Sequence, residues 1–207
     1  LEVTMHDGVD PNGNYQFGPH TGKMEDMTSM EQFMEAYKKQ LAFAIDYHLQ
    51  AYGICSSLHS LIAPTVFAST TVDDCIEKGR ILQKDGAKYS TTGTFISGVA
   101  NAADSLAAID QVCFQQKLMT LAEMRDMLDS NYAGKEEWHQ MLLNKYVHFG
   151  NDSDLVDDYC RQVVTFCAKE NQAHKDSRFG QYELILLNQT YNISESIIQI
   201  EVICLSI

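Results

Sequence analysis

Residues 88–109, KYSTTGTFISGVANAADSLAAI, constrain the fold more than any other stretch of this chain. The first half is rich in β-branched and aromatic residues and contains Gly93 and Gly98, whereas the second half is alanine-rich, with Leu106 and Ala107 at helical spacing. A β-prone segment that gives way to a period of 3.6 residues predicts a strand, a glycine turn and a helix. We therefore expect a strand over residues 88–97 and a helix over residues 100–116, which together form a βα unit of an α/β protein. Such proteins place their chemistry at the carboxyl ends of strands.

Helical patterns occupy most of the remaining sequence. A long helix should start with a capping box, either Thr28 with Glu31 or Ser29 with Gln32, and must end before Pro64. Its expected apolar stripe consists of Met30, Phe33, Met34, Tyr37, Leu41, Ala44 and Ile45. Further helices are expected at 70–80, 120–131, 135–145 and from 154 onward, whereas the turn-rich residues 5–24 should form a long surface connection. Short helices with one strand are typical of the outer layer of an α/β barrel.

The bulk composition excludes several classes of function. At a net charge of −13, the chain lacks the Lys and Arg clusters that a nucleic-acid surface requires. It has no apolar run of about 18 residues, which argues against a transmembrane helix, and no amino-terminal signal-peptide pattern. The six cysteines form no C-x-x-C pair, so we expect reduced, mostly buried thiols and a cytoplasmic location. The first residue is not Met, which fits a piece of something longer.

Common catalytic and metal-binding motifs are also missing. The seven histidines show no H-E-x-x-H spacing, and no C-x-x-C pair supports a metal site, so solvated or capping histidines are expected. Nucleotide-binding glycine loops and the G-x-S-x-G elbow are absent as well. The carboxylates near residue 154 are interpreted as a solvated helix start, because they lack the spacing of an EF-hand calcium loop.

Four blocks of the sequence resemble, in order, the glycyl radical enzymes, a family that includes pyruvate formate-lyase, glycerol dehydratase, choline lyase and arylacetate decarboxylases. The segment GAKYSTTGTFISGVANAADSLAAI is similar to the family pattern G-G-A-x-Y-N-x-T-G-x-x-x-x-G-x-A-N-x-A-D-S-L-A-A-I. DGVDPNGNYQFGPHTG resembles its D-G-x-D-x-x-x-G-x-x-x-G-P-x-T-G turn, and VDDCIEKGR and YVHFGNDSDLVDDYCRQV match two further blocks. The resemblance implies a partial α/β barrel that is mostly helical in this segment.

The resemblance also implies an activity. Intact members carry a glycyl radical, installed by an S-adenosylmethionine iron–sulfur activating enzyme, which generates a cysteine thiyl radical. That thiyl removes hydrogen from a small organic substrate and permits C–C, C–N or C–O cleavage under anaerobic conditions, in enzymes that can be homodimers. No cofactor is expected to be bound by this chain itself.

Both radical-bearing elements of the family are missing from the sequence. The R-V-x-G-Y motif of the radical glycine is absent, and Cys55 lies in a helical pattern with no resemblance to the catalytic cysteine loop. We therefore expect this chain alone to be inactive and assign it no catalytic residue. The alternative is a non-catalytic truncated paralogue or accessory piece that packs against another chain. An unrelated acidic helical domain is disfavoured by four ordered matches.

Within the resemblance, the strand tip is the candidate substrate pocket. Thr94, Phe95, Ile96 and Ser97 stand where many members have P-Q-G-V, and side chains at this tip face the substrate in some relatives. A pocket bordered by Phe95 and Ile96 would suit an apolar or aromatic substrate, although ordinary barrel packing by these two side chains is the alternative. The tip carries no carboxylate, so the decarboxylase branch is not chosen.

The family pattern divides the chain into two parts. Residues 1–173 are predicted to form the pyruvate formate-lyase-like barrel segment, and residues 174–207 an aberrant tail that a shift of reading frame could produce. Residues 177–179 are interpreted as the last trace of the family pattern. Alternation in YELILL and SIIQIEVICL still permits strands in this tail.

Overall fold

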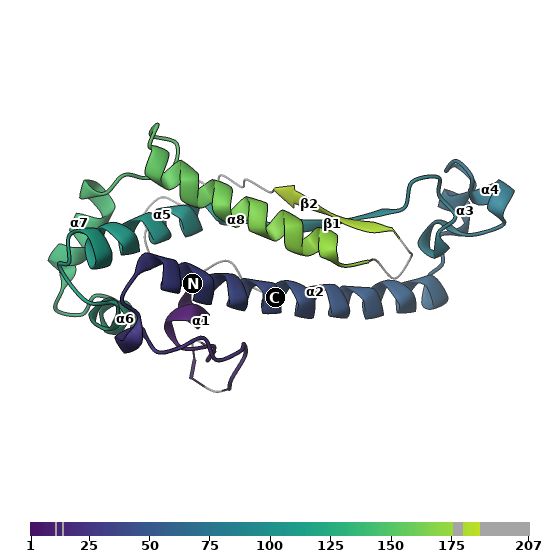
Figure 1. Cartoon of the computed structure of the whole chain (residues 1–207). Coiled ribbons are helices and arrows are strands. Elements are labelled where there is room, and N and C mark those ends of the chain that lie inside the picture. The colour runs from purple at the N-terminus through teal and green to yellow at the C-terminus, as the bar shows by residue number, and fades with distance from the viewer. Residues whose placement is uncertain (11, 14, 176–179, 187–207) are drawn as a thin grey trace. The chain divides into compact units, whose positions relative to one another are not determined.

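A computed structural model describes residues 1–10, 12–13, 15–175 and 180–186 (Figure 1). These residues divide into two compact units, one made of residues 1–41 and 96–166 and the other of residues 42–95 and 167–186. We call them the first and the second unit. Within the described ranges no helix has both the length and the apolar character needed to cross a membrane.

Helices dominate the described residues, and two strands pair with each other. The elements are α1 (Glu2–Met5), η1 (Met24–Asp26), α2 (Met30–Ile62), α3 (Val66–Ser69), α4 (Cys75–Lys78), η2 (Leu82–Lys84), β1 (Thr91–Ile96), α5 (Val99–Ile109), the π-helical η3 (Asp110–Gln115), α6 (Leu121–Asp129), α7 (Glu136–Lys145), α8 (Asp154–Ala173) and β2 (Gln181–Leu186). The expectation of a mostly helical segment with few strands is confirmed for these residues.

The predicted βα unit is present. β1 lies inside the range expected for the strand, and α5 with η3 spans residues 99–115, within one residue at each end of the helix expected over 100–116. Gly98, at φ +71°, forms the turn between them, a conformation that costs glycine little because it has no Cβ. Leu106 and Ala107 are fully buried, as the helical spacing predicted. The π-helical turn at the end of α5 was not foreseen, since its hydrogen-bond register leaves no mark on the apolar pattern.

The core of the first unit is built from sulfur-containing, aliphatic and aromatic side chains. Its least exposed large members are Phe33, Met24, Leu106, Ile109, Met124, Met127, Val112 and Val156. Full burial of a side chain of this size contributes roughly 1.5–3 kcal/mol. These residues come from α2, α5, η3, α6, α8 and the 3-10 turn η1, so each of these helices contributes its apolar face.

Capping residues set two helix starts as the sequence indicated. Thr120 and Glu123 form the reciprocal capping box of α6, with the Glu123 amide donating to Thr120 Oγ1 at 3.2 Å. At α2 the Ser29 and Gln32 alternative is the better match, because the Gln32 amide donates to Ser29 Oγ at 3.3 Å. The Gln32 side chain then reaches back to the amide of Thr28 (2.8 Å), one residue earlier than a standard box.

In the second unit, β1 pairs with β2 beside the end of α8. β2 includes residues 182–186 of the alternating YELILL segment, so a strand forms there as the alternation permitted. Tyr182 of β2 is buried, and its ring meets that of Tyr52 of α2 edge-on at 6.3 Å between centroids. Of the predicted tail (174–207), residues 187–207 lie outside the described residues, as do residues 176–179, which include the predicted last trace of the family pattern at 177–179.

Two expectations need correction. The connection over residues 5–24 is not simply a surface loop, because Asp10 and Met24 are buried and Val9 pairs with Gln16 in an antiparallel bridge.

The second correction concerns the cysteines, whose thiols are not all buried. Among the described residues, Cys75 and Cys167 are buried, Cys113 and Cys160 half-buried, and Cys55 exposed, all as free thiols. A free Cys in a helical pattern is therefore no guarantee of burial, because the apolar face of that helix need not be covered within this unit.

Candidate functional site

The predicted pocket residues lie at the end of β1, and their side chains differ in environment. Thr94 is 5% exposed and belongs to the second unit. Its hydroxyl lies 2.7 Å from Oδ1 of the buried Asn171 in α8 and 3.2 Å from the Glu183 carbonyl of β2. Asn171 in turn donates from Nδ2 to the Cys167 carbonyl at 2.8 Å. Thr94 therefore ties the strand to the helix end through a buried polar network.

The other three pocket residues are more open. Phe95 follows Thr94 in the strand, where buried and exposed residues alternate, and is 63% exposed, so its ring is largely uncovered. Ile96 is half-buried and Ser97 is exposed, and both are part of the first unit. The exposed ring of Phe95 is the feature of this strand end that is available to line a cavity.

Asp7 organises the turn block at the start of the chain. Its Oδ1 accepts hydrogen bonds from the amides of Thr21 (2.5 Å) and Gly22 (2.7 Å), while its Oδ2 lies 2.9 Å from His20 Nδ1. Burial alone would raise the pKa of this carboxyl, but the hydrogen bonds from His20, Gly22 and Thr21 together lower it. The Gln40 side chain of α2 then donates to the Pro19 carbonyl at 2.7 Å and to Thr21 Oγ1 at 3.0 Å, which fixes the turn on the helix.

Asp104 connects two other blocks of the family pattern. It sits on α5, where its Oδ1 accepts from the Phe149 amide (2.6 Å) and its Oδ2 lies 3.3 Å from His148 Nδ1. The remaining ring nitrogen of His148 bonds the Leu143 carbonyl at 3.0 Å. Burial raises the pKa of Asp104, and the bonds from Phe149 and His148 offset this only in part. The AADSL and YVHFGND segments are thus held together by one carboxylate.

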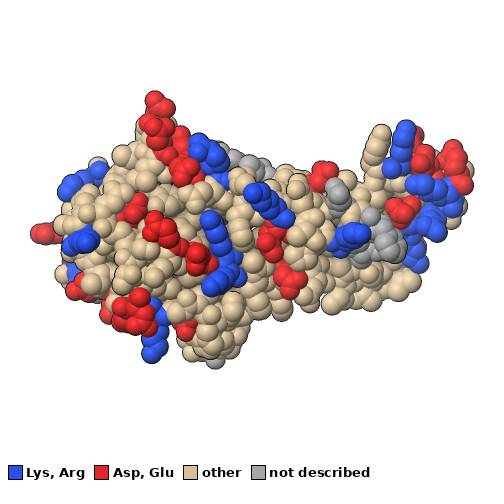
Figure 2. All heavy atoms as spheres, viewed as in Figure 1, with Lys and Arg blue, Asp and Glu red and all other residues tan. Residues whose placement is uncertain are grey.

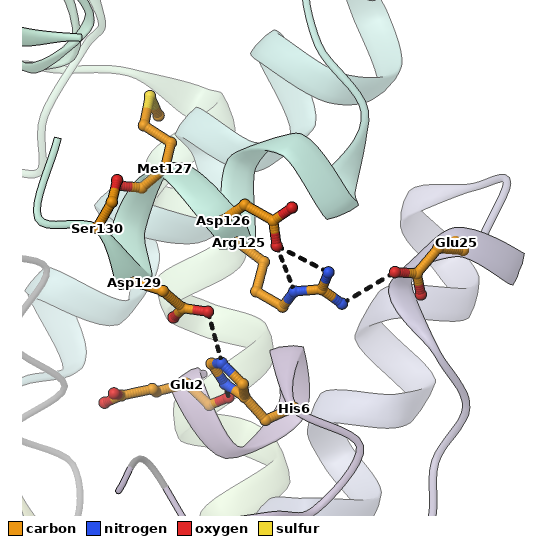
Figure 3. Close-up of polar contacts among 8 residues, drawn as sticks. All are labelled: Glu2, His6, Glu25, Arg125, Asp126, Met127, Asp129 and Ser130. Atoms are coloured by element: carbon orange, nitrogen blue, oxygen red, sulfur yellow. Dashed lines mark hydrogen bonds and ion pairs between the residues drawn. The ribbon is translucent and has the colours of Figure 1, made fainter. Parts of the chain in front are cut away.

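α6 makes a further polar contact with the amino-terminal segment. Figure 3 shows Arg125 pointing toward Asp126 and Glu25, and His6 pointing toward Asp129. Arg125 donates to Asp126 Oδ1 (3.0 and 2.8 Å) and lies 3.1 Å from Glu25. The hydrogen bond that Arg125 donates to Asp126 is the main cause that raises the pKa of Arg125. These pairs are partly exposed to solvent, which screens them, so each contributes little to stability. Their arrangement positions η1 and α1 and offers no open ligand site.

A hollow of about 810 Å³ lies in the first unit, between the segment that leads into α2 and the segment from η3 to α6. Its lining includes Met24, Met30 and Cys113. Burial, with a smaller effect of Glu123, raises the pKa of the Cys113 thiol to about 12, so this thiol stays protonated and is a poor nucleophile. The hollow brings together no set of catalytic groups.

Histidine pairs with aspartate in several places across the described chain. The pairs are His6 with Asp129, His20 with Asp7, His148 with Asp104 and His174 with Asp46. Within the ranges the structure describes, no three His, Cys, Asp or Glu side chains converge in a way that could hold a metal ion. These histidines therefore act as partners for carboxylates and backbone carbonyls.

Sequence comparison now decides the family. The model of the pyruvate formate lyase-like family matches residues 1–194. The chain belongs to the pyruvate formate lyase-like family. Trans-4-hydroxy-L-proline dehydratase of Clostridioides difficile is 32% identical over 193 residues, which cover 93% of this chain and 24% of that enzyme. The match runs past the expected boundary at residue 173, which stays a prediction.

Solved structures agree with the family assignment. The C. difficile hydroxyproline dehydratase, with its substrate trans-4-hydroxy-L-proline bound, superposes at a TM-score of 0.85 and 32% identity over 90% of this chain and 24% of its own. The B12-independent glycerol dehydratase of Clostridium butyricum gives 0.83 and 35%, over 88% and 23%. A glycyl radical enzyme of Archaeoglobus fulgidus gives 0.80 and 28%, over 88% and 23%. This family member thus spans about a quarter of the length of these relatives.

The resemblance inferred from four sequence blocks is therefore confirmed, and the structure shows how residues of three of them are held in place. In this pyruvate formate lyase-like chain, Asp7 and Asp104 accept hydrogen bonds from backbone amides. Asp7 thereby holds the segment at Thr21 and Gly22, and Asp104 holds the segment at Phe149. Gln40 and Asn171 also form long-range hydrogen bonds that hold segments together. The sequence did not predict these bonds, because each residue lies in a helical pattern that gives no indication of a distant partner. A polar residue at a buried helix position was the only available signal for them.

Proposed function

We propose that this chain forms part of a glycyl radical lyase or dehydratase that cleaves a C–O, C–C or C–N bond of a small organic substrate. The observation that carries the proposal is the family match over residues 1–194, together with TM-scores of 0.83 and 0.85 to two dehydratases at 35% and 32% identity. Dehydration breaks a C–O bond, so that reaction is favoured over an acyl transfer of the formate acetyltransferase type.

The chain's own contribution is structural and substrate-facing. When present, a glycyl radical supplies hydrogen abstraction, but neither its motif nor the loop-cysteine motif occurs in these 207 residues, so we assign no reaction step to them. Under the proposal, the intact enzyme works without oxygen in the cytoplasm, is activated by an S-adenosylmethionine iron–sulfur enzyme, and can be a homodimer. Of the predicted pocket residues, Phe95 would border the pocket, with its exposed ring facing an apolar part of the substrate.

The test is a segment exchange. Residues 1–194 replace the matching quarter of hydroxyproline dehydratase and, separately, of glycerol dehydratase, and each chimaera is activated without oxygen. We expect a glycyl radical signal in electron paramagnetic resonance and dehydration of hydroxyproline or glycerol, according to the host. Each host enzyme with its own segment, activated in the same way, is the control. Soluble, radical-bearing chimaeras that turn over none of these substrates would favour the accessory role instead.

Phe95 tests the pocket assignment in the same chimaeras. Phe95→Ala should change kcat/KM at least about fivefold, since loss of apolar contact with a substrate removes about 1 kcal/mol or more. Tyr89→Ala is the matched control, because Tyr89 is an aromatic residue close to the same strand and is 80% exposed. A changed unfolding temperature with an unchanged kcat/KM would assign Phe95 to packing alone.

A further inference from the structure

The carboxyl-terminal half of α2 has no charged residue on any side. Residues 47–72 contain no Asp, Glu, Lys or Arg, although such residues make up 21% of the chain. A helix of a globular protein that faces water normally carries charged side chains on its solvent face. In Figure 2 the lower right edge of the surface, over this half of α2, is tan with neither red nor blue. The composition of this helix fits a buried environment.

Large apolar side chains nevertheless stand exposed along one side of the helix. Ile54 is 64% exposed, Leu58 50% and Leu61 68%. They follow the i, i+4, i+7 spacing that puts side chains on one helix face. Tyr47, 56% exposed, lies seven residues before Ile54 and extends the same stripe. A contiguous apolar stripe of this kind is typical of a surface that another element covers.

A groove runs beside this apolar ridge. Gly53 and Ser57 line a shallow hollow with Ile54 and Leu58, and a Cβ placed on Gly53 would meet nothing within 4 Å. The Ser57 hydroxyl donates to the Gly53 carbonyl at 2.8 Å, so its polar group is already satisfied by the helix. Glycine weakens a helix interior, but it lets another backbone approach closely. A ridge next to a groove is the surface that helices use to pack on each other.

We propose that this surface, which we call the Ile54–Leu61 face (Gly53, Ile54, Ser57, Leu58 and Leu61), packs against an uncharged apolar α-helix from the part of the enzyme that lies outside this chain. The inference rests on the proposed function. The hydroxyproline and glycerol dehydratases have about three quarters of their length outside the matched region, which is long enough to contain such a helix. Depletion of charge at the contact is a property of permanent interfaces.

Other occupants fit this surface less well. Helices that lie on a membrane surface carry Lys or Arg along their polar face, and residues 47–72 have none. An extended strand needs open backbone donors and acceptors, which the inside of a helix does not offer. A second copy of this chain remains as an outcome of the test.

The test places a charge on the face and, as a matched control, beside it. Leu58→Glu puts a carboxylate in the ridge, whereas His59→Glu adds the same side chain at the next exposed position, about 100° around the helix. Both variants are made in the 207-residue chain and in the segment-exchange enzyme. Soluble yield, sedimentation and thermal unfolding are measured for each, and turnover of the segment-exchange enzyme is recorded separately.

The proposal predicts a difference that depends on context. In the 207-residue chain neither variant should shift the unfolding temperature, because both side chains are exposed. In the exchange enzyme, Leu58→Glu should lower the yield of assembled protein about tenfold or more, since an unpaired carboxylate would be buried, and His59→Glu should not. Equal behaviour of the two variants in the exchange enzyme would overturn the proposal. A 207-residue chain that dimerises, and loses the dimer with Leu58→Glu, would assign the face to a second copy instead. Loss of turnover with normal assembly would count against the proposed function and leave this face as inferred.

Discussion

The carboxylate of Asp7 offers the sharpest test of how the turn block is held together. Oδ1 alone accepts both backbone amides, from Thr21 at 2.5 Å and Gly22 at 2.7 Å, and Asp7 itself has φ +51°. Hydrogen bonds to a charged group contribute about 1.5–3 kcal/mol each, and this side chain is 26% exposed, so we take the lower end, about 3 kcal/mol for the pair. Alanine at this left-handed φ adds a further 1–2 kcal/mol or so.

Three substitutions separate these contributions. Asp7→Ala should lower the free energy of unfolding by about 4 kcal/mol, and Asp7→Gly by about 3 kcal/mol because glycine carries no penalty for positive φ. Asp7→Asn should cost only about 1 kcal/mol, since its amide oxygen still accepts both bonds and Asn tolerates the left-handed region. Urea denaturation of the 207-residue chain, followed by circular dichroism at pH 7, measures all three. If Asp7→Gly is as stable as the wild type, the two amide bonds do not hold the turn.

The same carboxylate predicts a pH dependence of defined sign. The pKa of Asp7 is lowered in the folded chain from its ordinary value of 3.8. Its stabilising contribution is therefore fully present above pH 3.8 and is lost as the pH falls through the lower, folded-state pKa. The difference in free energy of unfolding between wild type and Asp7→Asn should shrink below about pH 4. A difference that stays constant down to pH 3 would show that the charge of Asp7 plays no part.

Three further predictions concern single residues. Gly8→Ala should lower the free energy of unfolding by about 3 kcal/mol or more, because φ is +88° and the new Cβ would meet the Pro19 carbonyl at 2.5 Å. Gly13→Ala should cost only about 1 kcal/mol, because Gly13 has φ +68° but open space around it. Urea denaturation compares the two variants. Thr94→Val should cost about 1–3 kcal/mol by leaving a buried amide partner unsatisfied, and Thr94→Ser should recover most of it in the same assay. Alkylation at pH 8, followed by mass spectrometry, should show Cys113 reacting at least about a hundredfold more slowly than the exposed Cys55, because the pKa of Cys113 is about 12. Equal rates would contradict the burial of Cys113.

Local signals account for the parts of the fold that the sequence predicted well. The change from β-prone residues to helical spacing at Gly98 is contained within about two dozen residues, and β1 and α5 follow it. The α6 capping box is equally local, because Thr120 and Glu123 are three residues apart. Pro64 ends α2 as its missing amide requires. Each of these features is decided by neighbours in the chain.

Long-range partners explain what the sequence could not reveal. Asp104 accepts from an amide 45 residues away, and Thr94 meets Asn171 across 77 residues, so neither pairing has a local signature. The exposure of Cys55 has a related cause, since helical spacing identifies an apolar face but not the element that covers it. The pocket residues at the end of β1 stay a prediction for the same reason. A cavity is defined by all its walls, and this chain spans about a quarter of the relatives.

Turnover per radical in the segment-exchange enzymes tests the central claim most directly. The concentration of glycyl radical is measured by electron paramagnetic resonance, and product formed per minute is divided by that concentration for the chimaera and for the host enzyme. If residues 1–194 serve as a working quarter of a glycyl radical dehydratase, the chimaera should retain at least about one per cent of the host value, a loss of less than about 3 kcal/mol in transition-state stabilisation. A radical at the host level with no detectable product from either host would contradict the account.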